Sequence, residues 1–243
     1  MMLTVLGCGD AFGNGGRNNT AFLVTEKDEH ILLDCGTTTL IQLKKEQIDL
    51  EQVSVIILSH FHGDHFGGVP FFLISSMFET KRKSKLTIVG PKGVKEKVYA
   101  LQEAMYPGTT QRLSDLTLEF VAFEPERSIE IDDKRIIAYP VNHSEPSIPH
   151  GVRLTWCEKT IAFSGDTSWT DHLQPLSKGA DLFICECNFL DQQAYGHLSY
   201  HELMNKKDQL SCDAIWLTHM NDRVIEAPDI RFNRLEDGMK LTI

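Results

Sequence analysis

The sequence predicts an α/β fold of four layers, in which two β-sheets pack together and helices cover their outer faces. Short apolar strands come in clusters, helical segments are interposed in both halves of the chain, and glycine-rich turns separate the elements. Elements of this kind bury their apolar faces as stacked layers around a core. No low-complexity linker divides the sequence, so residues 1–243 are expected to form one domain.

The first half of the chain alternates short apolar runs with turn residues. Each run combines β-branched side chains with Gly, Asn or charged residues at its ends, which is typical of strands. Strands are predicted at residues 3–6, 20–25, 31–34, 53–58 and 86–89. Helices are predicted at residues 37–47, 71–78 and 94–105.

The second half repeats this style with more closely spaced strands. Strands are predicted at residues 116–123, 134–140, 152–157, 160–164, 182–185 and 214–217. Helices are predicted at residues 170–176 and 199–209. Ser199 and Glu202 lie three residues apart, the spacing of a capping box, so the second of these helices has a defined start.

The charge balance and the cysteine content restrict the class of protein. There are 24 basic and 34 acidic residues, a formal net charge of −10, which argues against a broad electrostatic grip on nucleic acid. The basic run at residues 81–85 is expected to be a solvated loop. No apolar run approaches the about 18 residues of a membrane span. Six cysteines in a chain of 243 residues do not indicate a disulfide framework, so a cytoplasmic location without membrane contact is expected.

A cluster of metal-ligand side chains directly follows the buried strand predicted at residues 53–58. His60, His62, Asp64 and His65 lie within six positions. At an extended strand end, His60 and His62 point the same way, because side chains repeat every two residues. Imidazole nitrogen and carboxylate oxygen suit zinc, and also iron or manganese. The cluster therefore predicts a metal site.

Three further ligand-type residues occupy matching positions at the ends of predicted strands. His143 follows the strand at 134–140, Asp166 follows the strand at 160–164, and His219 follows the strand at 214–217. The carboxyl ends of strands are where α/β proteins place their sites. Each residue alone is weak evidence, and their shared placement indicates a common site.

With these residues in place, the sequence resembles the metallo-β-lactamase superfamily, and within it the ribonuclease Z-like branch of phosphodiester hydrolases. The histidine cluster matches the defining motif of the superfamily, and the resemblance extends over residues 3–223. Further blocks match at residues 16–20, 33–36, 142–144, 164–167 and 217–219.

The resemblance implies two divalent metal ions, zinc in the first place and manganese or iron as alternatives. The implied ligands are His60, His62 and His143 for one ion, Asp64, His65 and His219 for the other, and Asp166 as a bridge between them. A hydroxide bridging the metals would attack a phosphodiester in line, while the ions neutralise the charge that develops on the phosphoryl oxygens.

A second constellation narrows the branch. Glu186, in a Cys-Glu-Cys-Asn segment, and His197, in a Gly-His-Leu-Ser segment, resemble the blocks in which a Glu orients a His that contacts the scissile phosphate or protonates the leaving oxygen. The alternative is that Glu186 caps a nearby backbone segment and His197 is a loop residue. Two features depart from the pattern of the branch: Leu198 intervenes between His197 and Ser199, and Cys185 and Cys187 flank Glu186. The candidate catalytic residues are Asp64, Glu186 and His197.

Other function classes use the same ligands. Thioester and lactone hydrolases do not need the pair of Glu186 and His197. Oxidoreductases with one iron lack a full second site. A metal-binding protein without catalysis that serves a biosynthetic pathway stays open, and so does a homodimeric state.

The interval between His143 and Asp166 bears on the substrate. Ribonuclease Z grips tRNA with a long basic arm inserted between the equivalent blocks, whereas here only 23 positions separate the two residues and two strands are predicted among them. The expected partner is therefore a small-molecule phosphodiester, such as a cyclic nucleotide, a cyclic sugar phosphate or a short diester, and a tRNA substrate is not expected.

Overall fold

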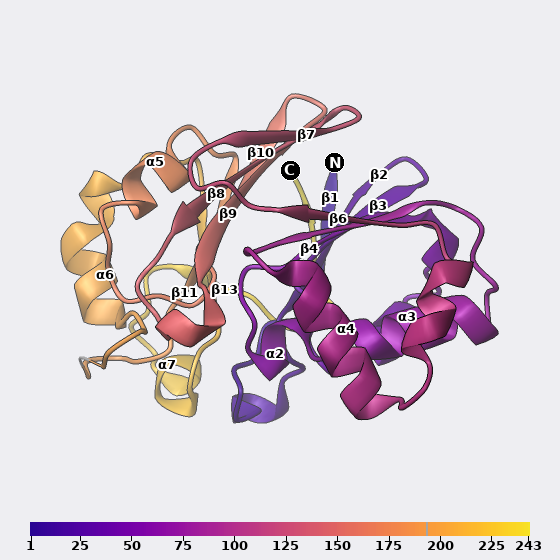
Figure 1. The fold of residues 1–243 in the computed structure, drawn as a ribbon. Coiled ribbons are helices and arrows are strands. Elements are labelled where there is room, and N and C mark those ends of the chain that lie inside the picture. The colour runs from indigo at the N-terminus through magenta and orange to yellow at the C-terminus, as the bar shows by residue number, and fades with distance from the viewer. Residues whose placement is uncertain (193) are drawn as a thin grey trace. The chain divides into compact units, whose positions relative to one another are not determined.

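The protein is described here by a computed structural model, which covers residues 1–192 and 194–243. Its chain divides into two compact units. The first unit comprises Met1–Gly7, Asn18–Ala122 and Asp237–Thr242, and the second comprises Cys8–Arg17, Phe123–Glu236 and Ile243. Each unit holds one seven-stranded sheet with helices of its own (Figure 1). The predicted α/β class is confirmed, while the single domain stays a prediction.

The sheet of the first unit is mixed. Its strands, in order across the sheet, are β14 (Lys240–Thr242), β1 (Met2–Gly7), β2 (Ala21–Glu26), β3 (Glu29–Leu33), β4 (Val53–Ile57), β5 (Leu86–Gly90) and β6 (Leu118–Ala122). The first three pairings are antiparallel, and the three from β3 onwards are parallel. Strand β5 is buried along its whole length, as parallel strands covered on both faces usually are.

The helices of the first unit are amphipathic or largely buried. They are α1 (Thr39–Lys45), α2 (Gly63–Phe66), α3 (Val69–Phe78) and α4 (Val94–Met105). Leu43, Phe72 and Val98 from three of these helices share one buried cluster with Ile56 and Ile88 of the sheet. Burial of such side chains contributes about 1.5–3 kcal/mol each, so this cluster fixes the helices on the sheet.

The sheet of the second unit repeats the same succession of pairings. Its strands, in order, are β7 (Ser128–Ile131), β8 (Lys134–Pro140), β9 (His150–Trp156), β10 (Lys159–Phe163), β11 (Leu182–Glu186), β12 (Ile215–Thr218) and β13 (Asn233–Arg234). The first three pairings are antiparallel and the last three are parallel. The two sheets therefore share the same succession of antiparallel and parallel pairings, although no repeat is evident in the sequence.

Three short helices belong to the second unit, namely α5 (Leu173–Ser177), α6 (Tyr200–Lys206) and α7 (Asp222–Glu226). The predicted start of the helix at 199 is confirmed, because the Ser199 side chain accepts a hydrogen bond from the backbone N–H of Glu202. Turns of 3₁₀ helix complete the chain at Asn14–Gly16, Leu50–Gln52, Thr110–Asp115, Glu145–Ser147 and Lys207–Gln209.

The basic run at residues 81–85 is a loop with Lys81, Lys83 and Lys85 exposed, as predicted, and Arg82 is the exception. The Arg82 side chain is buried, and its guanidinium donates to the backbone carbonyl oxygens of Leu50, Val53 and Lys85. A planar guanidinium carries five N–H donors in a fixed fork, which suits several carbonyl groups at once. This arginine therefore serves the fold and is removed from the surface patch.

The connection between β9 and β10 is as short as a hairpin allows. Only Cys157 and Glu158 separate the two strands, and both have positive φ, 49° and 62°, as a two-residue hairpin turn of type I′ requires. All residues between His143 and Asp166 are described, and the two strands with their turn occupy most of this interval. No inserted arm is present there.

Among residues 1–192 and 194–243, no helix has the length and apolar character that a membrane span requires.

Candidate functional site

The candidate residues of the first unit follow two adjacent parallel strands. Asp34 comes directly after β3, and Ser59 and His60 come shortly after β4. Because β3 and β4 run parallel, their carboxyl ends meet at one edge of the sheet. The four predicted ligands at positions 60–65 therefore start at the edge where Asp34 lies.

The structure brings these four predicted ligands together. The ring of His60 lies 4.8 Å from the ring of His62 and 4.1 Å from the ring of His65, between centroids. Helix α2 begins at Gly63 with His62 as its N-cap, which turns the next two side chains back toward the strand end. Nε2 of His65 then lies 3.3 Å from Oδ2 of Asp64. His60 and His65 are fully buried, and Asp64 is nearly so.

A buried carboxylate, Asp34, holds two of these histidines. Its Oδ1 accepts the backbone N–H of Ser59, and its Oδ2 accepts both the Ser59 hydroxyl and Nδ1–H of His65, each at 2.7 Å. Because the hydroxyl proton points at Asp34, the Ser59 oxygen accepts from Nδ1–H of His60 at 3.0 Å. Both rings thus carry their proton on Nδ1, which leaves the Nε2 lone pair as the ligand atom.

Burial raises the pKa of Asp34, and the hydrogen bonds and the charge of His65 oppose that rise. The residue also adopts a left-handed backbone conformation, with φ of 59°. A non-glycine residue in this region costs free energy and persists where the surrounding structure determines it. Here the backbone N–H of Asp34 is held by the carbonyl oxygen of Ile57 at 2.8 Å.

In the second unit, the candidate residues also gather at one edge of the sheet. His143 follows β8, Asp166 follows β10 and His219 follows β12. Strands β10 to β12 are parallel, and two successive antiparallel pairings give β8 the same direction. Nε2 of His219 lies 3.2 Å, and Nε2 of His143 lies 3.8 Å, from Oδ2 of Asp166. Oδ2 of Asp166 therefore lies close to two imidazoles that follow different strands.

The orientation of His143 explains a glycine in the sequence. Nδ1–H of His143 donates to the carbonyl oxygen of Gly196 at 2.8 Å, which again leaves Nε2 as the ligand atom. Gly196 has φ of 83°, and a Cβ at this position would lie 2.8 Å from Nδ1 of His143. Any larger residue at 196 would displace this ring.

Glu186 and His197 form a hydrogen-bonded pair in the same unit. Nδ1 of His197 lies 2.9 Å from Oε1 of Glu186, whose side chain is fully buried, while that of His197 is 22% exposed. The Glu186 carboxylate also accepts the backbone N–H groups of Thr167, Asn188 and Leu198. Glu186 thus caps nearby backbone and orients a histidine at once, so the two sequence-based alternatives for this residue coexist.

His197 lies among the candidate ligands of this unit. Its ring stacks on the ring of His219, with centroids 5.4 Å apart and an angle of 14° between the planes, and it meets the ring of His143 edge-on at 4.8 Å. Leu198, which departs from the pattern of the branch, is buried, and its backbone N–H holds Glu186. The departure therefore leaves the pair intact.

Sequence reasoning missed two supporting residues in the second unit. Asp10 is buried and accepts the backbone N–H groups of Phe12 and Asn14. Asn188 donates from Nδ2 to Asp10 and to the backbone carbonyl oxygen of His219, the latter at 2.9 Å. Two signals in the sequence could have indicated them. Asp10 is the acidic residue of the first glycine-rich turn, and Asn188 is an amide two positions after Glu186.

The donor atoms fit a divalent metal ion. Within the first unit, one ligand atom of His60 lies within 4.8 Å of one of His62, and the same holds for Asp64 and His65. Within the second unit, ligand atoms of His143 and Asp166 lie within 4.8 Å of each other, and so do those of Asp166 and His219. The ligand atoms of Glu186, His197 and His219 also lie within 4.8 Å of one another. Imidazole nitrogens beside carboxylate oxygens are the ligand set of zinc and related ions. The chain therefore carries a divalent metal-binding set.

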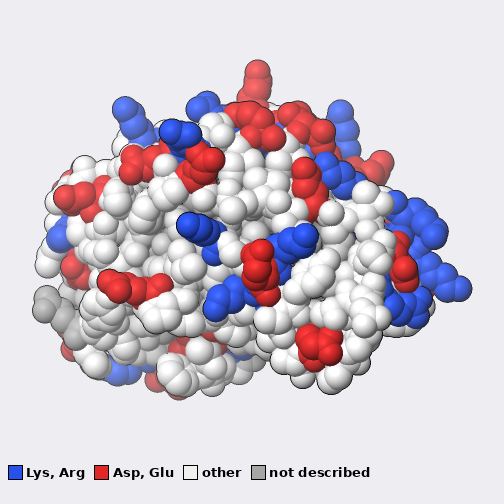
Figure 2. Space-filling view, in the orientation of Figure 1, with Lys and Arg blue, Asp and Glu red and all other residues white. Residues whose placement is uncertain are grey.

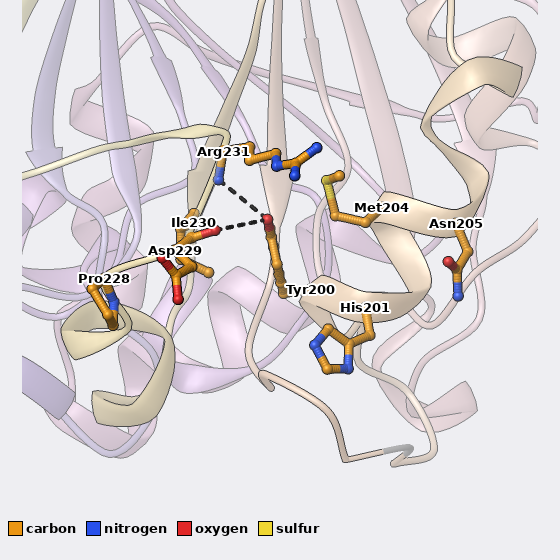
Figure 3. A pocket seen from close by; sticks show the side chains of 8 residues that line it. All are labelled: Tyr200, His201, Met204, Asn205, Pro228, Asp229, Ile230 and Arg231. Carbon is orange, nitrogen blue, oxygen red and sulfur yellow. Dashed lines mark hydrogen bonds between the residues drawn. The ribbon is translucent and has the colours of Figure 1, made fainter.

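A cavity of about 760 Å³ lies in the second unit, and none of the candidate residues lines it (Figure 3). It is bounded by α6 and by residues 228–231. The Tyr200 hydroxyl donates to the carbonyl oxygen of Asp229 and accepts the backbone N–H of Arg231, both at 3.2 Å. These bonds fasten the segment to α6, so the tyrosine has a structural role there.

The chain is similar in sequence and in fold to known metallo-hydrolases. Ribonuclease Z of Agathobacter rectalis is 24% identical over 268 residues, which is 86% of this chain and 84% of that protein. The probable metallo-hydrolase YhfI of Bacillus subtilis is 27% identical over 226 residues, 90% of this chain and 87% of that one. The crystal structure of YhfI, a metallo-β-lactamase fold protein, matches at 24% identity with a TM-score of 0.79, covering 99% of this chain and 98% of that chain. The short form of human tRNase Z matches at 24% identity with a TM-score of 0.80, covering 100% and 99%.

The fold, the site and these relatives define a metal-dependent hydrolase of the phosphodiesterase type with the metallo-β-lactamase fold, related to ribonuclease Z. The suspected superfamily and branch are thereby confirmed. The family model described as Anti-Pycsar protein Apyc1 matches residues 1–234, and the chain belongs to that family.

Proposed function

We propose that this protein is a dinuclear metal phosphodiesterase that hydrolyses a small phosphodiester: a cyclic nucleotide, a cyclic sugar phosphate or a short diester. The observation that carries the proposal is the pair of Glu186 and His197 beside the rings of His143 and His219. A phosphodiester with an alcohol leaving group needs a proton donor, which this pair can supply, whereas a thioester releases a thiolate that departs without one.

The proposed ligand sets are those expected from the sequence. His60, His62 and His143 would hold one ion, Asp64, His65 and His219 the other, and Asp166 would contact both. Zinc is the proposed metal, because imidazole and carboxylate donors suit it, with manganese or iron as the other candidates. When bound, such ions lower the pKa of water and neutralise charge on phosphoryl oxygens.

The residues of the chain supply the remaining chemistry. Asp34 and the Gly196 carbonyl keep Nε2 of His60, His65 and His143 as acceptors. The buried Glu186 carboxylate stabilises a positive charge on the His197 ring. In that form Nδ1–H stays bonded to Glu186 while Nε2–H is available to the oxygen that leaves the phosphorus. His197 would thus act as general acid, and Glu186 as the residue that positions it.

The proposed substrate is small because the features that grip a tRNA are weak here. The hairpin of β9 and β10 leaves no arm between His143 and Asp166. Burial of Arg82 removes one cation from the basic run at 81–85. Figure 2 shows Asp and Glu side chains interspersed with Lys and Arg over the face in view. With a net charge of −10, the chain offers few of the phosphate contacts on which tRNA affinity depends.

The cytoplasmic location expected from the sequence stays a prediction. No disulfide joins any of the six cysteines, all of which lie in the described part of the chain, and Cys35 is buried deeply enough to raise its pKa to about 12.

Asp166→Ala should lower the affinity for both metal ions, because one carboxylate is proposed to contact each of them. Metal content after dialysis against a graded series of zinc-buffer concentrations, measured by mass spectrometry, tests this. Asp171→Ala, an exposed aspartate five positions on, is the control and should bind metal as the wild type does. Retention of two ions at wild-type affinity in Asp166→Ala would show that the bridge is wrongly assigned.

His197→Ala should retain metal and lose turnover on a cyclic nucleotide by about 10²–10⁴-fold, because the departing ribose oxygen loses its proton donor. Hydrolysis of bis(p-nitrophenyl) phosphate should fall far less, since p-nitrophenolate departs without a proton. His201→Ala, at an exposed histidine nearby, is the control. Equal losses on both substrates would assign His197 to phosphate binding, and no loss on either would reopen lactone hydrolysis.

The substrate proposal is tested with one panel of cyclic nucleotides, bis(p-nitrophenyl) phosphate, a tRNA precursor, a thioester and a lactone, each with zinc and with manganese. The highest kcat/KM is expected on a small phosphodiester. Cleavage of the tRNA precursor at its 3′ end with a higher kcat/KM than any small diester would contradict the proposed substrate size.

A further inference from the structure

We infer that a pocket in the second unit, between Phe12 and Phe189, binds the base of a nucleotide substrate. This inference rests on the proposed function and adds a specificity-determining part to it. The pocket has a volume of about 340 Å³, within the range of small-molecule sites. Its lining residues are Phe12, Asn14, Asn188, Phe189, Asn221, Asp222 and Arg223.

The pocket is joined to the proposed reaction centre through two of its own residues. The ring of Phe189 meets the ring of His197 edge-on, with centroids 6.1 Å apart. Asn188 donates from Nδ2 to the backbone carbonyl oxygen of His219 at 2.9 Å, and its backbone N–H holds Glu186. A phosphate at His197 therefore places whatever is attached to its sugar within reach of this pocket.

Phe12 presents an aromatic face at the edge of the pocket. The residue is 88% exposed, the highest value among the exposed large apolar residues of the described chain. The loop that carries it is nonetheless held firmly, because buried Asp10 accepts the backbone N–H groups of Phe12 and Asn14, both at 3.1 Å. A fixed loop that exposes a phenyl ring provides a preorganised surface on which a base can stack.

Two amide side chains give the pocket hydrogen-bond acceptors. The Nδ2 groups of Asn14 and Asn188 both donate to Oδ2 of Asp10. With the NH₂ groups directed at the carboxylate, the Oδ1 atoms of both amides point away from it. Every nucleobase carries at least one N–H donor on its edge. Stacking together with amide acceptors is thus a chemistry that fits a nucleobase better than a sugar or an alkyl group.

The test compares a ribonucleoside 3′,5′-cyclic phosphate with the same cyclic ribose phosphate lacking the base. Phe12→Ala should raise KM for the cyclic nucleotide about 5- to 100-fold, because stacking is lost. The kcat should stay within about twofold, since the lost contact is made equally in the ground and transition states. KM for the abasic substrate should be unchanged, and Phe12→Trp should keep the wild-type KM. Phe78→Ala, at an exposed ring of the first unit, is the control.

A binding measurement separates this inference from the proposed function. Calorimetric titration with a nucleoside 5′-monophosphate and with ribose 5-phosphate should show tighter binding of the nucleotide to the wild type, and equal binding of the two to Phe12→Ala. If the wild type binds both ligands equally, or if Phe12→Ala leaves both KM and affinity unchanged, the base pocket is wrong while phosphodiester hydrolysis stands. If base-dependent binding occurs without hydrolysis of any diester, the proposed function fails and the pocket stands.

Discussion

Two buried carboxylates, Asp34 and Glu186, determine how the metal-ligand and acid-base side chains of this protein are held. Each is fully enclosed and accepts Nδ1–H of an imidazole; Asp34 also accepts one backbone N–H, and Glu186 accepts three. A buried charge without such partners would be costly, so these bonds are also what allows the carboxylates to lie inside the fold. These hydrogen bonds fix the ring orientations and the tautomers of His65 and His197.

The sheets put these carboxylates where they are needed. In each unit, three antiparallel pairings are followed by three parallel ones, and the candidate residues lie at carboxyl ends of strands that share a direction. Parallel strands collect their carboxyl ends at one edge, so residues far apart in sequence meet there. Asp34 and Ser59 are 25 positions apart, yet their side chains are bonded at 2.7 Å. The supporting network is thus a product of topology.

Because the network depends on topology, only the local part of the fold and site could be predicted from the sequence. The ligand motif at residues 60–65 and the blocks around His143, Asp166 and His219 are local, and the long apolar strands have a clear period or length. The strands β7, β13 and β14 were missed because they are two to four residues long and largely polar. Burial of Arg82 depends on carbonyl groups about 30 positions away, which no local pattern encodes.

The hydrogen-bonding partners of the histidines were hidden for the same reason. Asp34 lies inside a recognised block, but only the fold shows that it holds His65 directly and His60 through Ser59. Gly196 was recognised as part of a block, and only the fold shows that its carbonyl oxygen orients His143 and that a Cβ would strike that ring. The metal ligands can therefore be predicted from the sequence, whereas the hydrogen-bonding partners that determine which ring nitrogen can bind a metal cannot.

The central claim is that the fold sets these ligand atoms before any metal binds. Long-range ¹H–¹⁵N correlation spectra of histidine-labelled, metal-free protein above pH 7.5 measure the tautomer of each ring directly, with assignments from single His→Gln variants. The account predicts that His60, His65 and His143 carry their proton on Nδ1. It also predicts that Asp34→Asn shifts His60 and His65 toward the mixture of tautomers of a free imidazole, in which Nε2–H predominates. Predominant Nε2–H tautomers of these three residues in the metal-free wild type would contradict it.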